Sequence, residues 1–180
     1  MFAKVLIANR GAISCRIQRT LHQLGVKSVA VYSDADRESL HVLGADESVP
    51  LDGNLPAETY LDATKILAAA KQSGAEAIHP GYGFLSENAD FARACEAAGL
   101  VFLGPTPEQS ETCGLKHVCR DIVQAAGAPL LTGSGLLQTS EEAVSTAEDI
   151  GFPVIIKSSA GGGGIGMQIA RDSSEVAAKF

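Results

Sequence analysis

The segment of this sequence best suited to bind an anion combines a lysine with a run of glycines. Lys157 ends a short apolar stretch, and glycine occupies five of the six positions from 161 to 166. Glycines adopt backbone angles that other residues avoid, so their N–H groups can converge on phosphate oxygens. The lysine ammonium adds a positive charge for the same oxygens. The pattern predicts a phosphate-binding loop, and a hairpin tip without a ligand is the alternative.

The order of residues in this loop excludes two common nucleotide motifs. No Gly-Lys-Ser/Thr triplet follows the glycines, so the loop is not of the P-loop type. A dinucleotide-binding loop leads from a strand into a helix, whereas residues 167–170 have the pattern of a second strand. A glycine loop between two strands, with its lysine in front, suggests a flap that closes over a nucleotide.

Two further segments are candidates for binding. Lys116 stands at the predicted start of a helix, where the dipole disfavours a cation unless an anion lies nearby. From spacing alone, a surface lysine is the simpler interpretation there. The loop at residues 79–88 either forms part of a site or only packs through its aromatic residues. Its candidate side chains and glycine are His79, Tyr82, Gly83 and Glu87.

These segments need a scaffold, and the first hundred residues predict one. Apolar runs at residues 4–8, 28–32, 46–50, 75–79 and 101–103 alternate with helical patterns. Thr59 and Asn88 are predicted to cap two of these helices. Strands separated by helices form parallel sheets, so we expect an α/β fold with a Rossmann-like parallel sheet. The carboxyl ends of its strands, where functional loops lie, carry residues 9–11, 33–36 and 79–88.

The pattern changes after residue 105. We expect a first domain at residues 1–105, a helical linker at 106–130, and a different unit at 131–180. In this last unit, Thr139 and Glu142 predict a capping box. A strand, the glycine loop and a second strand follow, and Ser173 is predicted to cap a final helical turn.

Composition and charge exclude several classes of function. The chain carries 14 Lys and Arg against 21 Asp and Glu, a net charge of −7, so it has no surface suited to nucleic acid or anionic membranes. Its four cysteines lack zinc-ligand spacing, which predicts reduced thiols and no metal site. No leader or membrane-spanning run is evident, and no Gly-x-Ser-x-Gly elbow of a serine hydrolase occurs. We therefore expect a cytoplasmic protein.

The sequence resembles the biotin carboxylase family across essentially all of its length. The resemblance rests on LIANRGAISCRI, ADRESLHVLGADE, HPGYGFLSEN, FLGPTPE and IIKSSAGGGGIGM, which occur in this order. It implies a Rossmann-like pre-ATP-grasp domain followed by the start of an ATP-grasp domain. It also implies a ligase that activates bicarbonate with MgATP and then carboxylates biotin on a carrier domain.

The resemblance assigns roles to individual residues. It implies a homodimer in which Arg16 and Arg19 lie at the interface. It implies that the loop of Tyr82 lies close to biotin and bicarbonate, together with His79, Gly83 and Glu87. The residues that it implies for ATP are Lys116, Lys157, Gly162, Gly163, Gly164, Gly166 and Met167.

Details of the glycine flap point to one subfamily. Ala160 and Ile165 replace the Gly and Arg of many acetyl-CoA and pyruvate carboxylases, which makes this flap more similar to that of urea carboxylases and urea amidolyases. An acetyl-CoA, propionyl-CoA or pyruvate carboxylase is the alternative. The acidic Mg²⁺ ligands and the catalytic residues of the family lie beyond residue 180, so we expect an inactive N-terminal fragment.

Two hypotheses from other functional classes remain. The chain could be a non-catalytic module that binds a nucleotide. A dinucleotide-dependent enzyme is the third possibility, and it lacks the GxGxxG pattern after the first strand.

Overall fold

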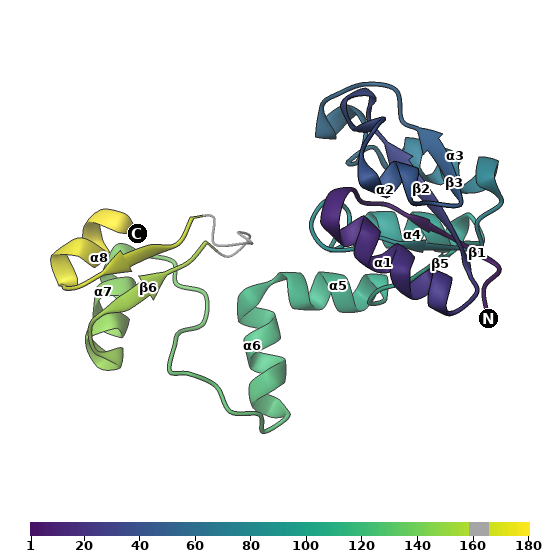
Figure 1. Ribbon diagram of the computed structural model, residues 1–180. Helices are drawn as coiled ribbons and strands as arrows, with labels where there is room; N and C mark the ends of the chain where they lie inside the picture. Colours follow the sequence, from purple (N-terminus) through teal and green to yellow (C-terminus); the bar gives the residue numbers. More distant parts are fainter. Residues whose placement is uncertain (159–165) are drawn as a thin grey trace. The chain divides into compact units, whose positions relative to one another are not determined.

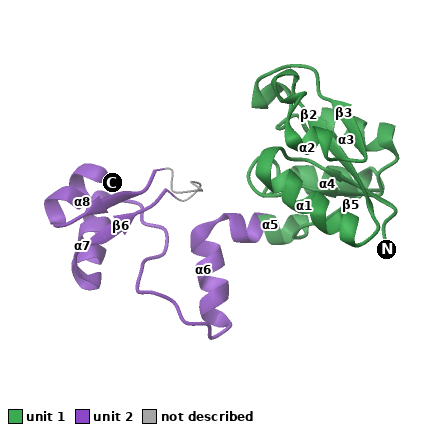
Figure 2. Cartoon of the chain, in the orientation of Figure 1, with its two compact units in different colours: residues 1–110 green, residues 111–180 purple. Residues whose placement is uncertain are grey.

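A parallel β-sheet organises the first of two units into which the chain divides, Met1–Ser110 and Glu111–Phe180 (Figure 2). The computed structural model describes residues 1–158 and 166–180. The strands of the first unit are β1 (Lys4–Ile7), β2 (Lys27–Tyr32), β3 (Glu47–Pro50), β4 (Ala77–His79) and β5 (Val101–Phe102). Its α-helices are α1 (Gly11–Gln23), α2 (Leu40–Leu43), α3 (Ala63–Ser73) and α4 (Ala89–Ala97), and two 3-10 turns, η1 (Asp34–Asp36) and η2 (Pro56–Glu58), follow β2 and β3.

The strand order is β3-β2-β1-β4-β5, and every neighbouring pair is parallel (Figure 1). This arrangement confirms the predicted Rossmann-like α/β fold. The chain first builds from β1 outward to β3, and then returns to place β4 on the other side of β1. The carboxyl ends of β1 and β4 therefore flank the point where the winding reverses, which is where open α/β sheets bind ligands.

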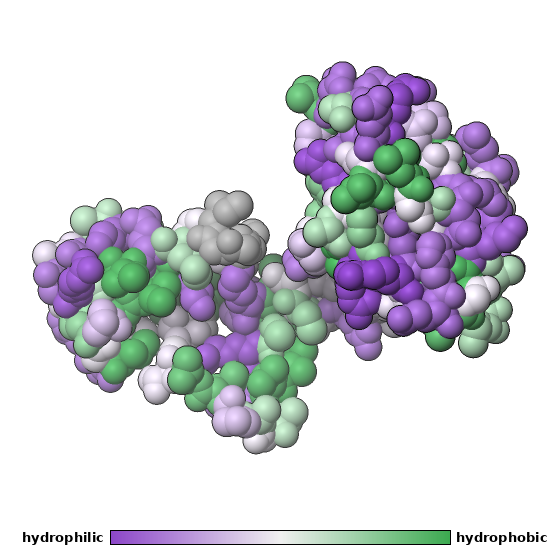
Figure 3. Space-filling view, viewed as in Figure 1, coloured by the Kyte–Doolittle hydropathy of each residue, from purple (hydrophilic) through white to green (hydrophobic). Residues whose placement is uncertain are grey.

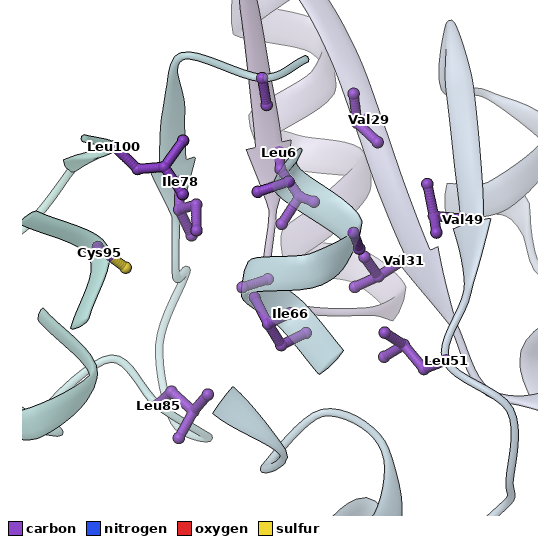
Figure 4. Close-up of a cluster of buried hydrophobic side chains, with 14 of the residues drawn as sticks. Leu6, Val29, Val31, Val49, Leu51, Ile66, Ile78, Leu85, Cys95 and Leu100 are labelled. Atoms are coloured by element: carbon purple, nitrogen blue, oxygen red, sulfur yellow. The ribbon is translucent and has the colours of Figure 1, made fainter. Parts of the chain in front are cut away.

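Both faces of the sheet are buried, which explains why the chain is continuously apolar from Val5 to the end of β1. Successive side chains of a strand point to opposite faces. Val5 and Ile7 pack with Ile17 of α1 on one face. Leu6 packs on the other face in a cluster that includes Ile66 of α3 (Figure 4). A parallel strand covered by helices on both sides has no position where a polar side chain would reach water.

The predicted start of one helix is confirmed, and the predicted start of another is wrong. The Asn88 side chain accepts a hydrogen bond from the N–H of Phe91 at 2.8 Å and caps α4 as predicted. Helix α3 begins at Ala63 rather than after Thr59, and Asp62 is its cap. The Thr59 hydroxyl instead donates to the Leu55 carbonyl at 2.8 Å, because the residues between them form the η2 turn.

The second unit combines helices with an antiparallel hairpin. Helix α5 (Pro107–Gly114) spans the division between the units, and α6 (Lys116–Ala125), α7 (Ser140–Ile150), β6 (Val154–Ile156), β7 (Gln168–Ala170) and α8 (Ser173–Lys179) follow it. Thr139 caps α7 by accepting from Glu142 N at 3.2 Å. Asp172 caps α8, so the prediction of Ser173 was wrong by one residue. Ala143 and Ala147 of α7 and Val176 of α8 form a small core with Ala170.

Helix α6 has no buried residue, and hydrophobic surface lies over it (Figure 3). Leu115 and Ile122 are 44% and 48% exposed. Among the described helices, none is both long and apolar enough to cross a membrane.

Candidate functional site

Asn9 joins the two loops at the point where the winding of the sheet reverses. It follows β1, is 3% exposed, and donates from Nδ2 to the carbonyls of Pro80 and Tyr82, at 2.8 Å each. Its Oδ1 accepts from the N–H of Arg10 at 2.9 Å. One amide thus fixes the exit of β1 against the loop after β4. The sequence indicated both loops but not this contact.

The loop after β4 has a backbone that requires glycine at Gly81. Its φ is +67°, and a Cβ there would lie 2.7 Å from Nδ2 of Asn9. Gly83 has the same φ with nothing within 4 Å of a Cβ position. Phe84, with φ of +42°, is one of two non-glycine residues of positive φ among those that the structure describes, and this conformation is costly for a bulky side chain. The constrained backbone of this loop and the buried Asn9 side chain together hold Tyr82 outward, and Tyr82 is 68% exposed.

A cationic and aromatic cluster lies beside this loop. The Arg10 guanidinium forms a 3.0 Å ion pair with Asp36 of η1. Its Cζ lies 5.2 Å from the ring centroid of Tyr60 and 5.7 Å from that of Phe84. The two rings stack at 5.2 Å. The sequence placed Asp36 in one of the expected functional loops but did not predict its pairing with Arg10. Tyr60 was missed, because a single Tyr in a loop carries no motif.

Hydrogen bonds set the ionisation of this cluster. Burial disfavours the charged form of Asp36, but bonds from the Tyr60 hydroxyl at 2.6 Å, Ser33 at 2.8 Å and Arg10 outweigh it and lower the pKa of the Asp36 carboxyl. Burial, with the bond to Asp36, raises the pKa of Tyr60 to about 12. Near neutral pH, Asp36 is therefore a carboxylate held by a neutral phenol and a guanidinium.

An open pocket of about 300 Å³ lies at the joined loops. It is lined by Asn9, Arg10, Ala12, Ile13, Tyr82, Gly83 and Phe84. The pocket offers the Arg10 cation, the N-terminal end of α1 and the aromatic side chains of Tyr82 and Phe84. These groups suit a small ligand with a negatively charged or carbonyl group.

Two of the predicted loop residues do not line this pocket. His79 is partly buried at the end of β4, and its Nδ1 accepts from Gly81 N at 3.0 Å. Burial lowers the pKa of His79, so the ring is neutral at pH 7 and shapes the loop. Glu87 is exposed near the start of α4. Tyr82 and Gly83 are therefore the two predicted residues that the structure brings to the pocket.

The phosphate-binding candidates lie in the second unit. Lys157 is exposed directly after β6, and Gly166 and Met167 precede β7. Lys116 is the first residue of α6, whose first turn contains no acidic residue. Gly162, Gly163 and Gly164 lie outside the described residues.

The outer face of the hairpin is apolar. Val154 and Ile156 pack against the core of the second unit. Ile155 pairs with Ile169 and both are about half exposed, at 53% and 51%. Met167, two residues before Ile169, is 49% exposed. The hairpin therefore combines an exposed cation with an apolar surface, a combination that suits phosphate and purine groups.

Arg16 and Arg19 do not line the pocket at the joined loops. Both are exposed on α1, and Arg16 donates to the hydroxyl of Thr20. Arg19 lines a second pocket, of about 710 Å³, with residues of α1 and α2.

The described residues do not fit a resident metal ion. They contain no group of three or more His, Cys, Asp or Glu side chains placed to hold one. Mg²⁺ takes oxygen ligands, chiefly carboxylates, phosphates and waters. The described part of the chain thus offers cations for a nucleotide but no carboxylate cluster for its metal.

Two families match consecutive parts of the chain. Residues 1–109 match the family described as biotin carboxylase, N-terminal domain. Residues 116–180 match the family described as carbamoyl-phosphate synthase L chain, ATP binding domain. The first match coincides with the parallel-sheet unit, and the second covers the hairpin with Lys157.

Relatives extend the similarity over nearly the whole chain. A urea amidolyase from Saccharomyces cerevisiae is 57% identical over 93% of this chain and 9% of its own length. A biotin carboxylase from Halalkalibacterium halodurans is 53% identical over 100% of the chain and 40% of its own length. The biotin carboxylase domain dimer of Hydrogenobacter thermophilus 2-oxoglutarate carboxylase, in complex with MgADP, ADP and bicarbonate, is 47% identical with a TM-score of 0.90, over 98% of this chain and 39% of that one. The chain thus spans between 9% and 40% of the length of these relatives.

Proposed function

Because this chain belongs to the family of the biotin carboxylase N-terminal domain, we propose that it supplies the first part of a ligase that carboxylates biotin with MgATP and bicarbonate. The observation that carries the proposal is the order of its two units. A parallel-sheet unit with a pocket where its winding reverses is followed by an ATP-binding type of hairpin that presents Lys157. The similarity to a domain solved with MgADP and bicarbonate supports the same choice of ligands.

We assign the nucleotide to the second unit. Lys157 and Lys116 would bind phosphate oxygens as point charges. The backbone of Gly162, Gly163, Gly164 and Gly166 would close over the phosphates. Met167, with the exposed outer face of the hairpin, offers apolar area to the purine.

We assign the biotin and bicarbonate side to the loop after β4. Tyr82 and Gly83 line the pocket there, while His79 and Glu87 flank them. Arg10 adds a positive charge to this wall. Since Arg10 is held by Asp36, its guanidinium stays in place without a ligand, which lowers the entropy lost on binding.

We propose that residues outside this chain supply the chemical step. No carboxylate cluster for Mg²⁺ occurs among the described residues, so the metal and the groups that activate bicarbonate belong to the rest of the enzyme. The chain alone should therefore be inactive. The same proposal includes a biotin carrier domain as the partner that presents biotin. It also includes a homodimer with Arg16 and Arg19 at its interface, and a cytoplasmic location.

Urea is the acceptor that we favour. The flap sequence around Ala160 and Ile165 supports it, as does the 57% identity to a urea amidolyase. An acyl-CoA or pyruvate is the alternative, because a biotin carboxylase is almost as similar, at 53%.

The test measures bicarbonate-dependent ATP cleavage by the intact gene product with free biotin, and then with urea. Carboxybiotin formation with transfer to urea supports the whole proposal, while carboxybiotin without transfer returns the acceptor to the alternatives. A Lys157→Met variant should raise KM for ATP, and Lys71→Met, an exposed lysine of α3, is its control. No ATP cleavage by the intact protein would contradict the enzyme assignment and leave a nucleotide-binding module.

A further inference from the structure

The guanidinium of Arg10 uses only a small part of its hydrogen-bonding capacity inside the protein. Nη1 donates to Oδ2 of Asp36 at 3.0 Å, and within residues 1–158 and 166–180 the guanidinium has no other acceptor. A guanidinium carries several N–H donors in a rigid, planar fork. The side chain of Arg10 is 41% exposed and lines the open pocket at the joined loops. Arg10 therefore has donors left for a ligand in this pocket.

The orientation of this guanidinium is fixed by Asp36 and by two aromatic rings. Oδ2 of Asp36 also accepts from the Tyr60 hydroxyl at 2.6 Å and from Ser33 Oγ at 2.8 Å. The Tyr60 oxygen accepts in turn from the backbone N–H of Ser33 at 3.0 Å, which ties the carboxylate to the end of β2. Arg10 Cζ lies 5.2 Å from the ring centroid of Tyr60 and 5.7 Å from that of Phe84. An arginine held in this way presents its remaining donors in one direction.

Asp36 also cancels the charge of Arg10. Burial disfavours the charged form of Asp36, but hydrogen bonds from Tyr60, Ser33 and Arg10 outweigh it and lower the pKa of the carboxyl. Asp36 is therefore ionised at neutral pH, and its ion pair with Arg10 is neutral as a whole. An anion that entered the pocket would be repelled by Asp36 as well as attracted by Arg10. A neutral carbonyl requires only the N–H donors and avoids this repulsion.

The other groups of the pocket suit a compact ligand with little charge. Both N–H groups of the Asn9 amide are already used, by the carbonyls of Pro80 and Tyr82. A volume of about 300 Å³ is far more than an anion the size of bicarbonate needs, and lies in the range of sites for small organic molecules. The remaining lining residues are apolar, aromatic or glycine: Ala12, Ile13, Tyr82, Gly83 and Phe84.

We infer that Arg10 is a specificity-determining residue of this pocket, which donates to the neutral carbonyl of a compact cyclic ligand, and that Asp36 is the positioning residue that also excludes anions. Biotin carries such a carbonyl in its ureido ring, whereas bicarbonate is an anion. The choice of biotin as the ligand rests on the function proposed above. It separates the two substrates, because only biotin would contact Arg10.

The experiment measures bicarbonate-dependent ATP cleavage by the intact gene product while free biotin, bicarbonate and ATP are varied in turn. Arg10→Met should raise KM for biotin about tenfold, the loss expected for one hydrogen bond from a charged donor, and leave KM for bicarbonate and ATP unchanged. Arg10→Lys should not restore KM for biotin, because an ammonium lacks the planar fork. A rise of all three KM values together, or a fall in kcat alone, would show a merely structural role and overturn the inference.

Arg37→Met is the matched control for Arg10→Met. Arg37 is exposed, pairs with Asp34 of the η1 turn at 3.4 Å, and does not line the pocket. All three KM values should stay at the wild-type level in this variant. The same rise in KM for biotin in Arg37→Met would mean that the net charge of the surface, and not the position of Arg10, matters.

Asp36→Asn tests the charge balance, with acetate as the probe. Without the carboxylate, Arg10 becomes an uncompensated cation, so acetate should inhibit competitively against biotin at concentrations that leave the wild type unaffected. Asp34→Asn is the control, because Asp34 pairs with Arg37 outside the pocket. Equal inhibition of wild type and Asp36→Asn, or inhibition of neither, contradicts the exclusion of anions by Asp36.

A failure of the proposed function is distinguishable from a failure of this inference. Wild-type protein without bicarbonate-dependent ATP cleavage would contradict the ligase assignment. Binding of free biotin to the same intact variants, followed by saturation-transfer NMR, then decides the role of Arg10. Binding that persists in Arg37→Met and is lost in Arg10→Met supports that role. Binding that Arg10→Met leaves intact, or wild-type protein that does not bind biotin, overturns it.

Discussion

Replacing Asn9 with alanine should release the loop after β4 from the end of β1. The Asn9 amide is the donor for two carbonyls, those of Pro80 and Tyr82, in a setting where Asn9 itself is 3% exposed. Each buried acceptor that loses its donor costs about 1–3 kcal/mol. Allowing for water at the Tyr82 side, Asn9→Ala should lower the stability of the first unit by about 2–4 kcal/mol. Asn9→Asp should cost more, because a carboxylate oxygen would face both carbonyls.

Gly81 makes the contact testable by a double-mutant cycle. In Gly81→Ala, the new Cβ meets Nδ2 of Asn9 at 2.7 Å and also suffers from φ of +67°. Gly83→Ala is the matched control, since its φ is the same and its Cβ would meet nothing within 4 Å. The positive φ alone costs about 1 kcal/mol, and the clash should add to it at Gly81. Asn9→Ala removes the Nδ2 and Cγ atoms that the new Cβ would meet at 2.7 and 3.1 Å and leaves the Cβ of residue 9 at 3.2 Å. The worst of the clash is therefore relieved in this background, and the two changes should couple by about 1 kcal/mol.

Hydrogen exchange followed by mass spectrometry is the suitable assay. The chain has two units, so one unfolding transition cannot be assumed. Amides of β1 and β4 lie in the centre of the sheet and exchange through global opening of the first unit. Equal losses for Gly81→Ala and Gly83→Ala, or additive losses with Asn9→Ala, would refute the role given to the Asn9 amide.

The remaining predictions concern polar groups around the same sheet. Because the pKa of Asp36 is lowered from 3.8, its contribution to stability is present above that pH and is lost as the pH falls below it. Tyr60→Phe removes one cause of the shift, so the stability difference between wild type and variant should shrink in acid, measured by hydrogen exchange. Tyr60 should ionise only near pH 12, which ultraviolet difference absorbance against Tyr60→Phe would detect. The stability that comes from its raised pKa should be lost as the pH rises from 10 to 12. Ionisation of Tyr60 near pH 10 would contradict its burial. Lys65 donates to the carbonyls of Leu51, Asp52 and Glu58 at 2.7–2.8 Å, so Lys65→Met should cost about 1.5–3 kcal/mol in exchange protection of α3, whereas Lys71→Met should not.

The sequence predicted the scaffold because burial acts on every residue of a strand. In β1, the three residues Val5, Leu6 and Ile7 must each face one buried side or the other, and the resulting apolar run is visible without a structure. Capping is also local, which is why Asn88 was identified correctly. At Thr59 the local signal failed, because Asp62 stands three residues later and is an equally good cap.

The candidate site was predicted in part. Tyr82 and Gly83 were found because glycines beside an aromatic residue at the end of a strand are a local pattern. Tyr60 was missed, and so was the pairing of Arg10 and Tyr60 with Asp36, since these residues are 24 to 50 positions apart and belong to no motif. No periodicity links such residues.

The sequence by itself determined which segments are strands, which loops end them, and which residues carry charge or glycine. The tertiary structure decided which of those loops meet. Placing β4 beside β1, rather than outside β3, brings residue 9 against residues 80 and 82. The position of β4 depends on which strand edges pair and which helices cover them. The free energy that favours this arrangement comes from the packing of the whole sheet and not from any one stretch of residues.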